Sequence, residues 1–331
     1  MIAQLAGAAE AEPGKLLEAI QHQVSSIYEN SRGAVVRIQA TDRHGRLSGT
    51  GFFIDPNGTI YTSYTVGGES EDIVVTVGER SFPATRLIGD LRSGIAILKI
   101  SAETPFLTLG KSSDLGIASP IVTVGYPMDL PLTPTFGIVG GFDIMYLGRY
   151  FATTHIRANI AAQRGEGGAP LLDLKGTVVG ILVSRLDSSG SASFALPIEA
   201  AEKVRKDFLR FHEVRPGWIG VHIRGSSEVS GGSCVVIDEV QPDAPAFKAG
   251  VLPGDILLQL GSRKITHPED VLDAIFYITA EDDLLMRVAR SGTELEMHVR
   301  PLDPPESGHP KIPPLGAVAE PTPTPLKIGG N

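Results

Sequence analysis

The sequence contains a single cysteine, Cys234, among 331 residues, so an intramolecular disulfide bond is excluded. It lacks an apolar run of about 18 residues, so no transmembrane helix is expected. Lysine and arginine are scattered and the net charge is −9, which argues against nucleic acid as a partner, because phosphate binding depends on clustered basic side chains. Histidine, cysteine and carboxylate residues show no metal-ligand spacing, so the sequence predicts no metal site and no cofactor.

The composition is that of an ordinary globular protein, with 42% hydrophobic residues and enough length for two or three domains. The first residues, MIAQLAGAAEAEP, are either the remnant of a cleaved export signal or an unstructured tail. Cys234 lies in the apolar run CVVI, which predicts a buried thiol on a β-strand. The C-terminal stretch, residues 303–331, is rich in proline and poor in large apolar residues, and we expect it to be disordered.

Periodicity divides the remaining chain into a helical and a β-rich part. Residues 1–30 are expected to form a tail and an amphipathic helix, because their apolar residues recur at helical spacing before Gly33. From residue 34 onward, short β-rich runs alternate with turn signals about every 8 to 12 residues, among them a turn at Pro56, Asn57 and Gly58. Two sets of such runs, separated near residues 105–112, predict two β-barrels packed together.

Several segments carry a resemblance to a known family. GTGFFIDPNGTIYTSYTV, LIGDLRSGIAILKI, TVGYP and GEGGAPLLDLKGTVVGILV occur in the order typical of HtrA (Deg) serine proteases, which they resemble. APAFKAGVLPGDILLQLGSRKI followed by HPEDVLDAIFYI resembles a PDZ domain, with a helix that begins near Pro268. The resemblance implies a mainly β fold: a chymotrypsin-like double β-barrel with an exit helix over residues 31–210, then one α+β PDZ domain over residues 215–302.

The same resemblance assigns the three positions of the catalytic triad. The histidine position falls on Thr65, the aspartate position on Gly94 and the nucleophilic serine position on Gly167. Acyl transfer needs a nucleophile, a general base and a carboxylate that orients the base, and none of these side chains is present at its expected position. The resemblance therefore implies a pseudoprotease with no catalytic residues, in which all three triad positions are replaced.

The oxyanion hole implied by the resemblance consists of the backbone N–H groups of Gly165 and Gly167. Glu166 stands between them, and we expect its side chain to face solvent and pair weakly with Arg164. Other candidate groups do not match the catalytic register. They are the histidines His44 and His155 and the hydroxyl residues Ser63 and Ser184.

Two peptide-binding surfaces remain when catalysis is removed. The first is the cleft between the barrels, where the resemblance places the substrate against residues 181–184. The second is the PDZ groove, whose loop would receive a C-terminal carboxylate on its backbone N–H groups. The implied peptide-binding residues are Trp218, Ile219, Gly220, Val221, Ile223, Val271, Ile275 and Phe276, and plain core packing is an equally good interpretation of each apolar one.

These observations support three hypotheses of different classes. The first is an inactive HtrA-like protein of the periplasm or cell envelope that binds peptide C-termini or unfolded segments as an adaptor or regulator. The second is an active serine endopeptidase in envelope protein quality control that uses displaced residues, and the third is a structural assembly protein. An active HtrA relative is a candidate partner, and the N-terminal helix is a candidate contact of a homo-trimer, as in the family.

Overall fold

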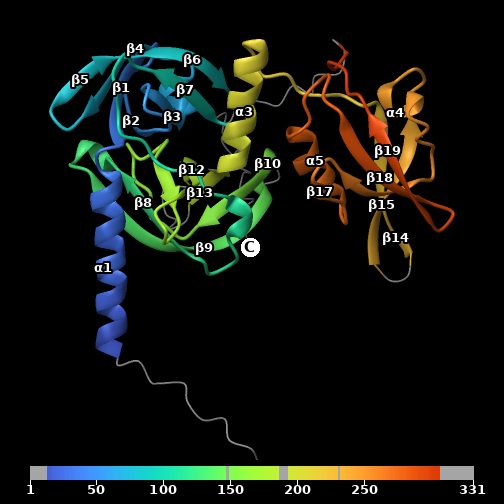
Figure 1. Ribbon diagram of the computed structural model, residues 1–331, viewed down its shortest axis with the longest axis horizontal. Coiled ribbons are helices and arrows are strands. Elements are labelled where there is room, and N and C mark those ends of the chain that lie inside the picture. Colours follow the sequence, from blue (N-terminus) through green and yellow to red (C-terminus); the bar gives the residue numbers. More distant parts are fainter. Residues whose placement is uncertain (1–12, 147–148, 186–192, 230–231, 306–331) are drawn as a thin grey trace, which may run out of the picture.

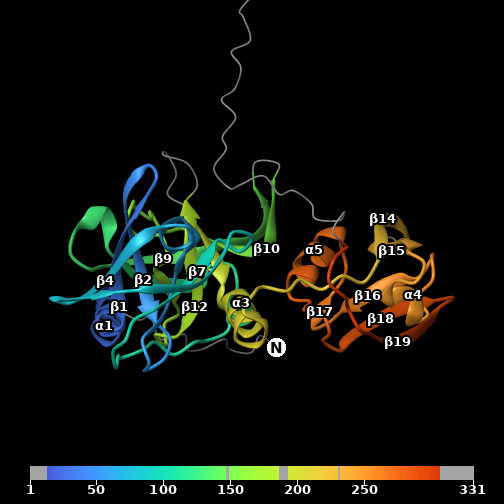
Figure 2. The ribbon, with the colours of Figure 1, turned by 90° about the horizontal axis from the view of Figure 1, so that it is seen from above.

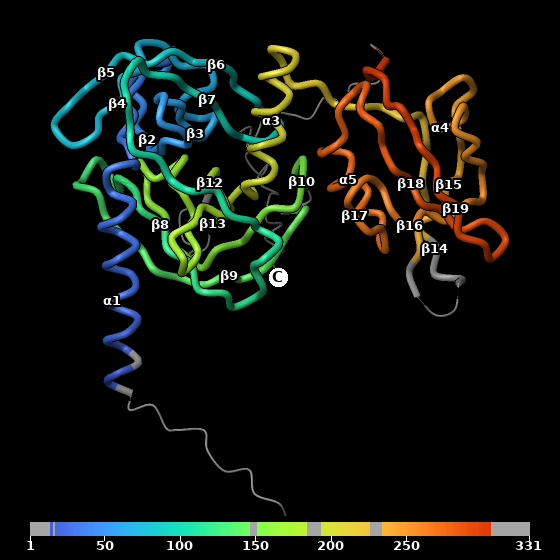
Figure 3. The backbone as a smooth tube through the Cα atoms, viewed as in Figure 1, coloured from blue at the N-terminus to red at the C-terminus, as the bar shows by residue number. Residues whose placement is uncertain are grey.

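The computed structural model describes residues 13–146, 149–185, 193–229 and 232–305. Two β-rich halves of a barrel unit lie together, and a third unit lies to one side of them, joined through helix α3 (Figure 1). The tube trace shows the connection that leaves α3 and enters the third unit (Figure 3). None of the helices in these ranges is both long enough and apolar enough to cross a membrane.

Helix α1 (Pro13–Ser31) projects from the barrels, and only its C-terminal half docks onto them (Figure 1). Ile27 is buried in the main core, with Val24 and Tyr28 packed against that core. Leu17 and Ile20 remain exposed. The predicted amphipathic helix is therefore present, and its apolar stripe serves intramolecular docking over its last two turns only.

The first half of the barrel unit is a curled seven-stranded sheet in the order β5-β4-β1-β2-β3-β7-β6, with every neighbouring pair antiparallel. Its strands are β1 (Val35–Asp42), β2 (Gly45–Phe53), β3 (Thr59–Ser63), β4 (Glu71–Val77), β5 (Arg80–Pro83), β6 (Thr85–Asp90) and β7 (Ile95–Lys99). The predicted turn after β2 contains Gly58, whose φ of 84° suits a residue without a Cβ atom. After β3 the chain does not continue as a strand but enters the one-turn helix α2 (Tyr64–Gly67).

The second half is a closed barrel in the order β10-β13-β12-β11-β8-β9. Its strands are β8 (Pro120–Gly125), β9 (Thr133–Tyr146), β10 (Arg149–Ala158), β11 (Pro170–Leu172), β12 (Val178–Arg185) and β13 (Ser193–Pro197), and two short 3₁₀ turns, η1 (Ser112–Asp114) and η2 (Pro127–Asp129), flank β8. The apolar residues of both halves and of the following helix α3 (Ile198–Phe211) meet in one large core. That shared core fixes the position of the cleft that runs between the halves.

The third unit has its own core and a sheet in the order β14-β15-β16-β18-β19, with the short β17 paired to β16. Its elements are β14 (Val221–Val229), β15 (Gly232–Val240), α4 (Pro245–Lys248), β16 (Ile256–Leu260), β17 (Arg263–Lys264), α5 (Pro268–Phe276), β18 (Leu284–Arg290) and β19 (Thr293–Val299). Helix α5 begins at Pro268, as predicted, because proline suits the first helical position. Cys234 on β15 is only partly buried, so the prediction of a buried thiol was wrong.

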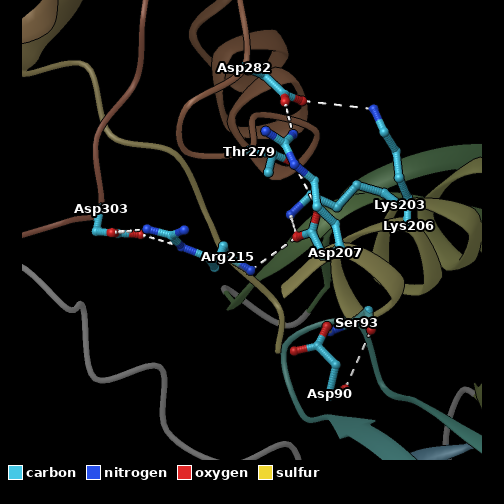
Figure 4. Close-up of polar contacts among 10 residues, drawn as sticks. Asp90, Ser93, Lys203, Lys206, Asp207, Arg215, Thr279, Asp282 and Asp303 are labelled. Atoms are coloured by element: carbon cyan, nitrogen blue, oxygen red, sulfur yellow. Dashed lines mark hydrogen bonds and ion pairs between the residues drawn. The ribbon is translucent and has the colours of Figure 1, made fainter. Parts of the chain in front are cut away.

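Polar contacts join the third unit to helix α3, which lies between it and the barrels (Figure 2). Asp207 on α3 is 1% exposed and accepts hydrogen bonds from the Lys203 Nζ (2.6 Å), the Thr279 hydroxyl (2.8 Å) and the Arg215 N–H (3.0 Å) (Figure 4). The ammonium group of Lys203 is also buried, and the Asp207 carboxylate is its counter-charge. No local sequence pattern predicted this network.

Candidate active site and peptide-binding surfaces

The turn between β10 and β11 brings Gly167 to the middle of the cleft. A Cβ atom added at Gly167 would lie 3.1 Å from the Ser63 Oγ and 3.9 Å from the Thr65 Oγ1, which are themselves 3.0 Å apart. Ser63 is fully buried at the end of β3, whereas Thr65 is exposed on α2. The positions predicted for nucleophile and base are thus neighbours, and a pair of hydroxyl groups lies beside them.

Gly94 lies in the turn between β6 and β7, on the wall of the same cleft. Its φ is 79°, a region that favours glycine, and a Cβ atom there would lie 3.6 Å from the Cβ of Val183 on β12. The nearby carboxylate of Asp90 is directed into its own turn, where it accepts a 3.0 Å hydrogen bond from the Ser93 N–H. Asp90 therefore does not take the place of an orienting carboxylate.

The peptide groups of Gly165 and Gly167 have a defined orientation. The carbonyl that precedes Gly165 accepts a 2.6 Å hydrogen bond from the Met128 N–H, and the carbonyl that precedes Gly167 accepts a 2.9 Å bond from the Ala169 N–H. Because the N–H and C=O of a trans peptide point in opposite directions, both glycine N–H groups point away from these donors. Neither N–H has an acceptor among the described residues, and both glycines line a cavity of about 430 Å³.

Glu166, between the two glycines, does not face solvent. Its side chain is 1% exposed, its Oε2 accepts a 2.6 Å hydrogen bond from the Gln163 N–H, and its Oε1 is buried without a described partner. A Cβ atom at Gly125 on β8 would lie 3.2 Å from its Cγ, so the carboxylate packs behind the turn. The predicted solvent exposure and pairing with Arg164 were wrong, and burial raises the pKa of the Glu166 carboxyl above its ordinary value.

A larger cavity of about 870 Å³ continues the cleft past Thr65 and Gly94. His155 on β10 lines it, stacked on Phe151 with ring centroids 4.2 Å apart. The Nδ1 of His155 lies 2.7 Å from the Thr153 carbonyl, which accepts its proton, and burial lowers the pKa of the imidazole to about 4. His155 is therefore a neutral histidine. The sequence predicted its position on a strand but not its place in the wall of this cavity. Its stacking partner is four residues away, which is an uninformative spacing on a strand.

The third unit presents an open sheet edge beside a helix. Strand β14 is an edge strand of the sheet. Its Gly225 lies next to Pro268 at the start of α5, because a Cβ atom added at Gly225 would lie 3.1 Å from the Pro268 Cγ. The Ile219 and Gly220 carbonyls accept hydrogen bonds from the N–H groups of α4 and of the chain after β15. The N–H groups of Gly220 and Val221 consequently point the opposite way.

The predicted groove residues fall into three groups. Ile219 and Val271 are buried in the core of the third unit, with Ile223 and Val221 partly buried against it. Ile275 on α5 is exposed, and the Trp218 N–H is bound to the Leu302 carbonyl. Phe276 belongs to the barrel core instead, near the ammonium of Lys203, so its assignment to the groove wall is corrected.

Two family models match the chain. The trypsin-like peptidase domain matches residues 49–181, and the PDZ domain matches residues 217–300. This order, on a double β-barrel followed by a small sheet with a groove helix, decides the assignment. The chain belongs to the HtrA family. The fold expected from the sequence, a chymotrypsin-like double β-barrel followed by a PDZ domain, is confirmed.

Individual proteins of the HtrA family are similar to this chain over most of its length. The chain is 28% identical over 84% of its length to "Probable periplasmic serine endoprotease DegP-like" of Hahella chejuensis, and covers 62% of that protein. It is 32% identical over 76% of its length to the protein of the same name from Pseudomonas fluorescens, covering 55% of it. It thus spans about three fifths of the length of such relatives. The solved structure "HtrA-type protease AlgW with tripeptide" is 23% identical, with a TM-score of 0.69, and covers 86% of this chain and 99% of that one.

The HtrA resemblance alone missed two arginines of the cleft. Arg46 on β2 and Arg164 both line the cavity that holds the glycine N–H groups, and both are exposed. Neither guanidinium group has an ion pair or hydrogen bond with a described residue. They are far apart in the sequence, so no local pattern could have paired them.

Proposed function

We propose that this HtrA-family chain binds extended peptide segments without cleaving them and acts as an adaptor or regulator. The observation that carries the proposal is the cleft centre, where Gly167 supplies no nucleophile and Thr65 supplies no base. In a related triad, loss of the serine alone lowers kcat by about 10⁶-fold. The neighbouring Ser63 is fully buried and so cannot reach a substrate carbonyl.

Peptide binding is supported by two sheet features. In the third unit, the free edge of β14 next to α5 can pair with a peptide strand, and the N–H groups of Gly220 and Val221 can donate hydrogen bonds to its carboxylate. In the barrels, Val183 of the implied substrate-pairing strand lines the 870 Å³ cavity. Both features are available without acyl-transfer chemistry.

An active endopeptidase is the second candidate, because one observation favours it. His155 lines the cleft as a neutral imidazole whose Nδ1–H is held by Thr153, which leaves its Nε2 free of a proton. Its described hydrogen bond goes to that carbonyl and not to Ser63 or Thr65, so no nucleophile is coupled to it. We therefore prefer the binding function.

A peptidase assay separates these two candidates. Fluorescent casein should remain uncleaved by the purified chain, and a serine-directed phosphonate should label no residue. An active HtrA protease, assayed beside it, provides the positive control. Casein cleavage that the phosphonate abolishes, with the label mapped to one serine, would replace the binding function by the endopeptidase.

Location and partners are proposed by analogy with the family. Its relatives are named periplasmic, and we propose the periplasm or cell envelope for this chain, with an active HtrA protein as a candidate partner. A homo-trimer, or a structural assembly role, would use the exposed part of α1 around Leu17 and Ile20. Light scattering of the wild type and of a Leu17→Glu, Ile20→Glu variant tests this, because loss of an oligomer only in the variant is the expected result.

A further inference from the structure

We propose that the centre of the barrel cleft is a carboxylate receptor, which holds the free C-terminus of an extended peptide at the place where a protease would cut. The inference rests on the proposed peptide-binding function and names the chemistry that the cleft recognises. The receptor consists of the N–H groups of Gly165 and Gly167 and the side chains of Arg46 and Arg164.

The two N–H groups form the fixed part of the receptor. Each lies opposite a carbonyl that is already hydrogen-bonded, at 2.6 Å to Met128 and 2.9 Å to Ala169, so the peptide planes are held in place. An N–H without an acceptor in a partly buried site costs free energy, and an anion is the ligand that relieves this cost. A carboxylate offers two oxygen atoms to the two donors.

The arginines supply the charge. Arg46 from β2 and Arg164 from the turn both line the 430 Å³ cavity, and neither is paired with a described carboxylate. Asp72 and Asp129 line a neighbouring cavity of about 400 Å³ that the two arginines also border. Neither carboxylate forms an ion pair with these two arginines, because Asp129 accepts a hydrogen bond from Ser48 and Asp72 accepts one from Thr41. Two guanidinium groups without a direct ion pair to a described residue, together with two free N–H groups, favour an anion.

Glu166 also lines this cavity and is the group that could oppose an anion, so the position of its carboxyl group matters. Its carboxyl packs behind the turn near Gly125 and is bound to the Gln163 N–H. Burial also raises its pKa, which favours the neutral form. The absence of a side chain at Gly167 leaves room in front of the turn for the ligand.

The apolar walls of the cavity define the residue next to the carboxylate. Val66, Ala162 and Leu182 line the cavity together with the two glycines. These side chains suit a small aliphatic residue at the peptide C-terminus. A peptide ending in such a residue with a free carboxylate is therefore the ligand class that this site takes.

Photocrosslinking tests the receptor in the full-length chain. The probe is the peptide Ala-Ala-Ala-Ala-photoleucine with a free carboxylate, compared with its C-terminal amide. After irradiation, mass spectrometry maps the crosslinks to the barrel cleft, near Ala162 or Leu182, or to the PDZ groove, near Ile223 or Val271. We expect the peptide with the free carboxylate to crosslink to the cleft. The amide should need about a tenfold higher peptide concentration to reach half of its maximal cleft crosslinking.

Charge variants and a matched control locate the effect. Arg46→Gln with Arg164→Gln should weaken cleft crosslinking of the acid by about tenfold and leave the amide unchanged. Arg32→Gln with Arg80→Gln removes the same charge from the same barrel unit, outside this cavity, and should change neither. Equal thermal unfolding of the two double variants shows that both fold.

The outcomes separate the receptor from the proposed function. Equal cleft crosslinking of acid and amide overturns the receptor but leaves peptide binding intact, and crosslinks confined to the PDZ groove overturn it as well. Hydrolysis of the probe overturns the proposed function itself. A C-terminally amidated peptide with photoleucine followed by glutamate tests whether a side-chain carboxylate can replace the C-terminal one. If it crosslinks to the cleft as well as the peptide with the free C-terminus does, the receptor also binds side-chain carboxylates.

Discussion

The Thr279 hydroxyl of the PDZ unit donates a 2.8 Å hydrogen bond to the Asp207 carboxylate of helix α3. The same carboxylate neutralises the buried ammonium of Lys203 and accepts the Arg215 N–H (Figure 4). One side chain thus joins the exit helix, the connection after it and the PDZ unit. Asp273 of α5 makes a similar contact, accepting a 2.8 Å bond from the Thr154 N–H of β10.

Substitution of Asp207 should destabilise the protein strongly. Asp207→Asn leaves the Lys203 ammonium buried without a counter-charge, which costs about 3 kcal/mol of unfolding free energy. Asp282→Asn is the matched control, because Asp282 pairs with Arg210 and Lys206 at the surface and should cost less than about 1 kcal/mol. Urea unfolding of both variants measures the difference. Equal losses would show that the buried pair has no special role.

PDZ occupancy should be visible in the fluorescence of Trp218, the only tryptophan of the chain. A peptide with an apolar last residue and a free carboxylate should shift its emission, because the neighbouring N–H groups of Gly220 and Val221 would bind that carboxylate. Ile223→Asp should abolish the shift, whereas Phe276→Leu, which alters the barrel side of α5, should preserve it. An amidated peptide that shifts the emission equally would rule out carboxylate capture by this loop.

The buried His155 should make the wild type sensitive to acid. Its folded pKa of about 4 lies below the ordinary value of 6.5, so the unfolded chain binds more protons between these values. This contribution to stability is therefore full above pH 6.5 and is lost as the pH falls toward 4, by up to about 3 kcal/mol. His155→Phe keeps the aromatic stack on Phe151 and should flatten this part of the stability curve. An unchanged slope in the variant would contradict the assignment.

Glu166 should affect the pH dependence of stability in the opposite direction. Its folded pKa is raised above the ordinary value of 4.5, so the folded chain holds the proton more tightly, and stability falls as the pH rises through the folded pKa. Glu166→Gln removes the buried charge and should be more stable than the wild type by about 1 kcal/mol at neutral pH. The gain should disappear below pH 4.5. Thermal unfolding of the wild type and the variant at several pH values measures this gain and its loss in acid. A gain in stability that persists in acid would indicate a packing effect instead.

The sequence predicted those features that depend on local pattern. The start of α5 at Pro268, the turn at Gly58 and the adjacency of Thr65 and Gly167 follow from capping, turn chemistry and family register. The inward side chain of Glu166 and the barrel-facing Phe276 do not, because both depend on neighbours distant in sequence. Long-range packing overrides what a charged or apolar residue would do in isolation.

Restoring the triad provides the most direct test of the cleft, because triad residues act as a unit and partial sets give almost no rate. Thr65→His, Gly94→Asp and Gly167→Ser should each leave peptidase activity at the background of the parent. The structure adds a constraint at Gly94, whose φ of 79° strains an aspartate, and at Gly167, where the new Cβ lies 3.1 Å from the Ser63 Oγ.

The triple variant should therefore cleave casein measurably but slowly, and Ser63→Ala added to it should raise the rate by relieving the contact with the new serine. Glu166→Asn should raise it slightly further, because it removes the residual negative charge of a carboxyl group that packs behind the turn carrying the two oxyanion N–H groups. Labelling by a serine-directed phosphonate must map to position 167. If any single variant were as active as the triple one, the cleft would already contain the missing partners, and the pseudoprotease interpretation would be wrong.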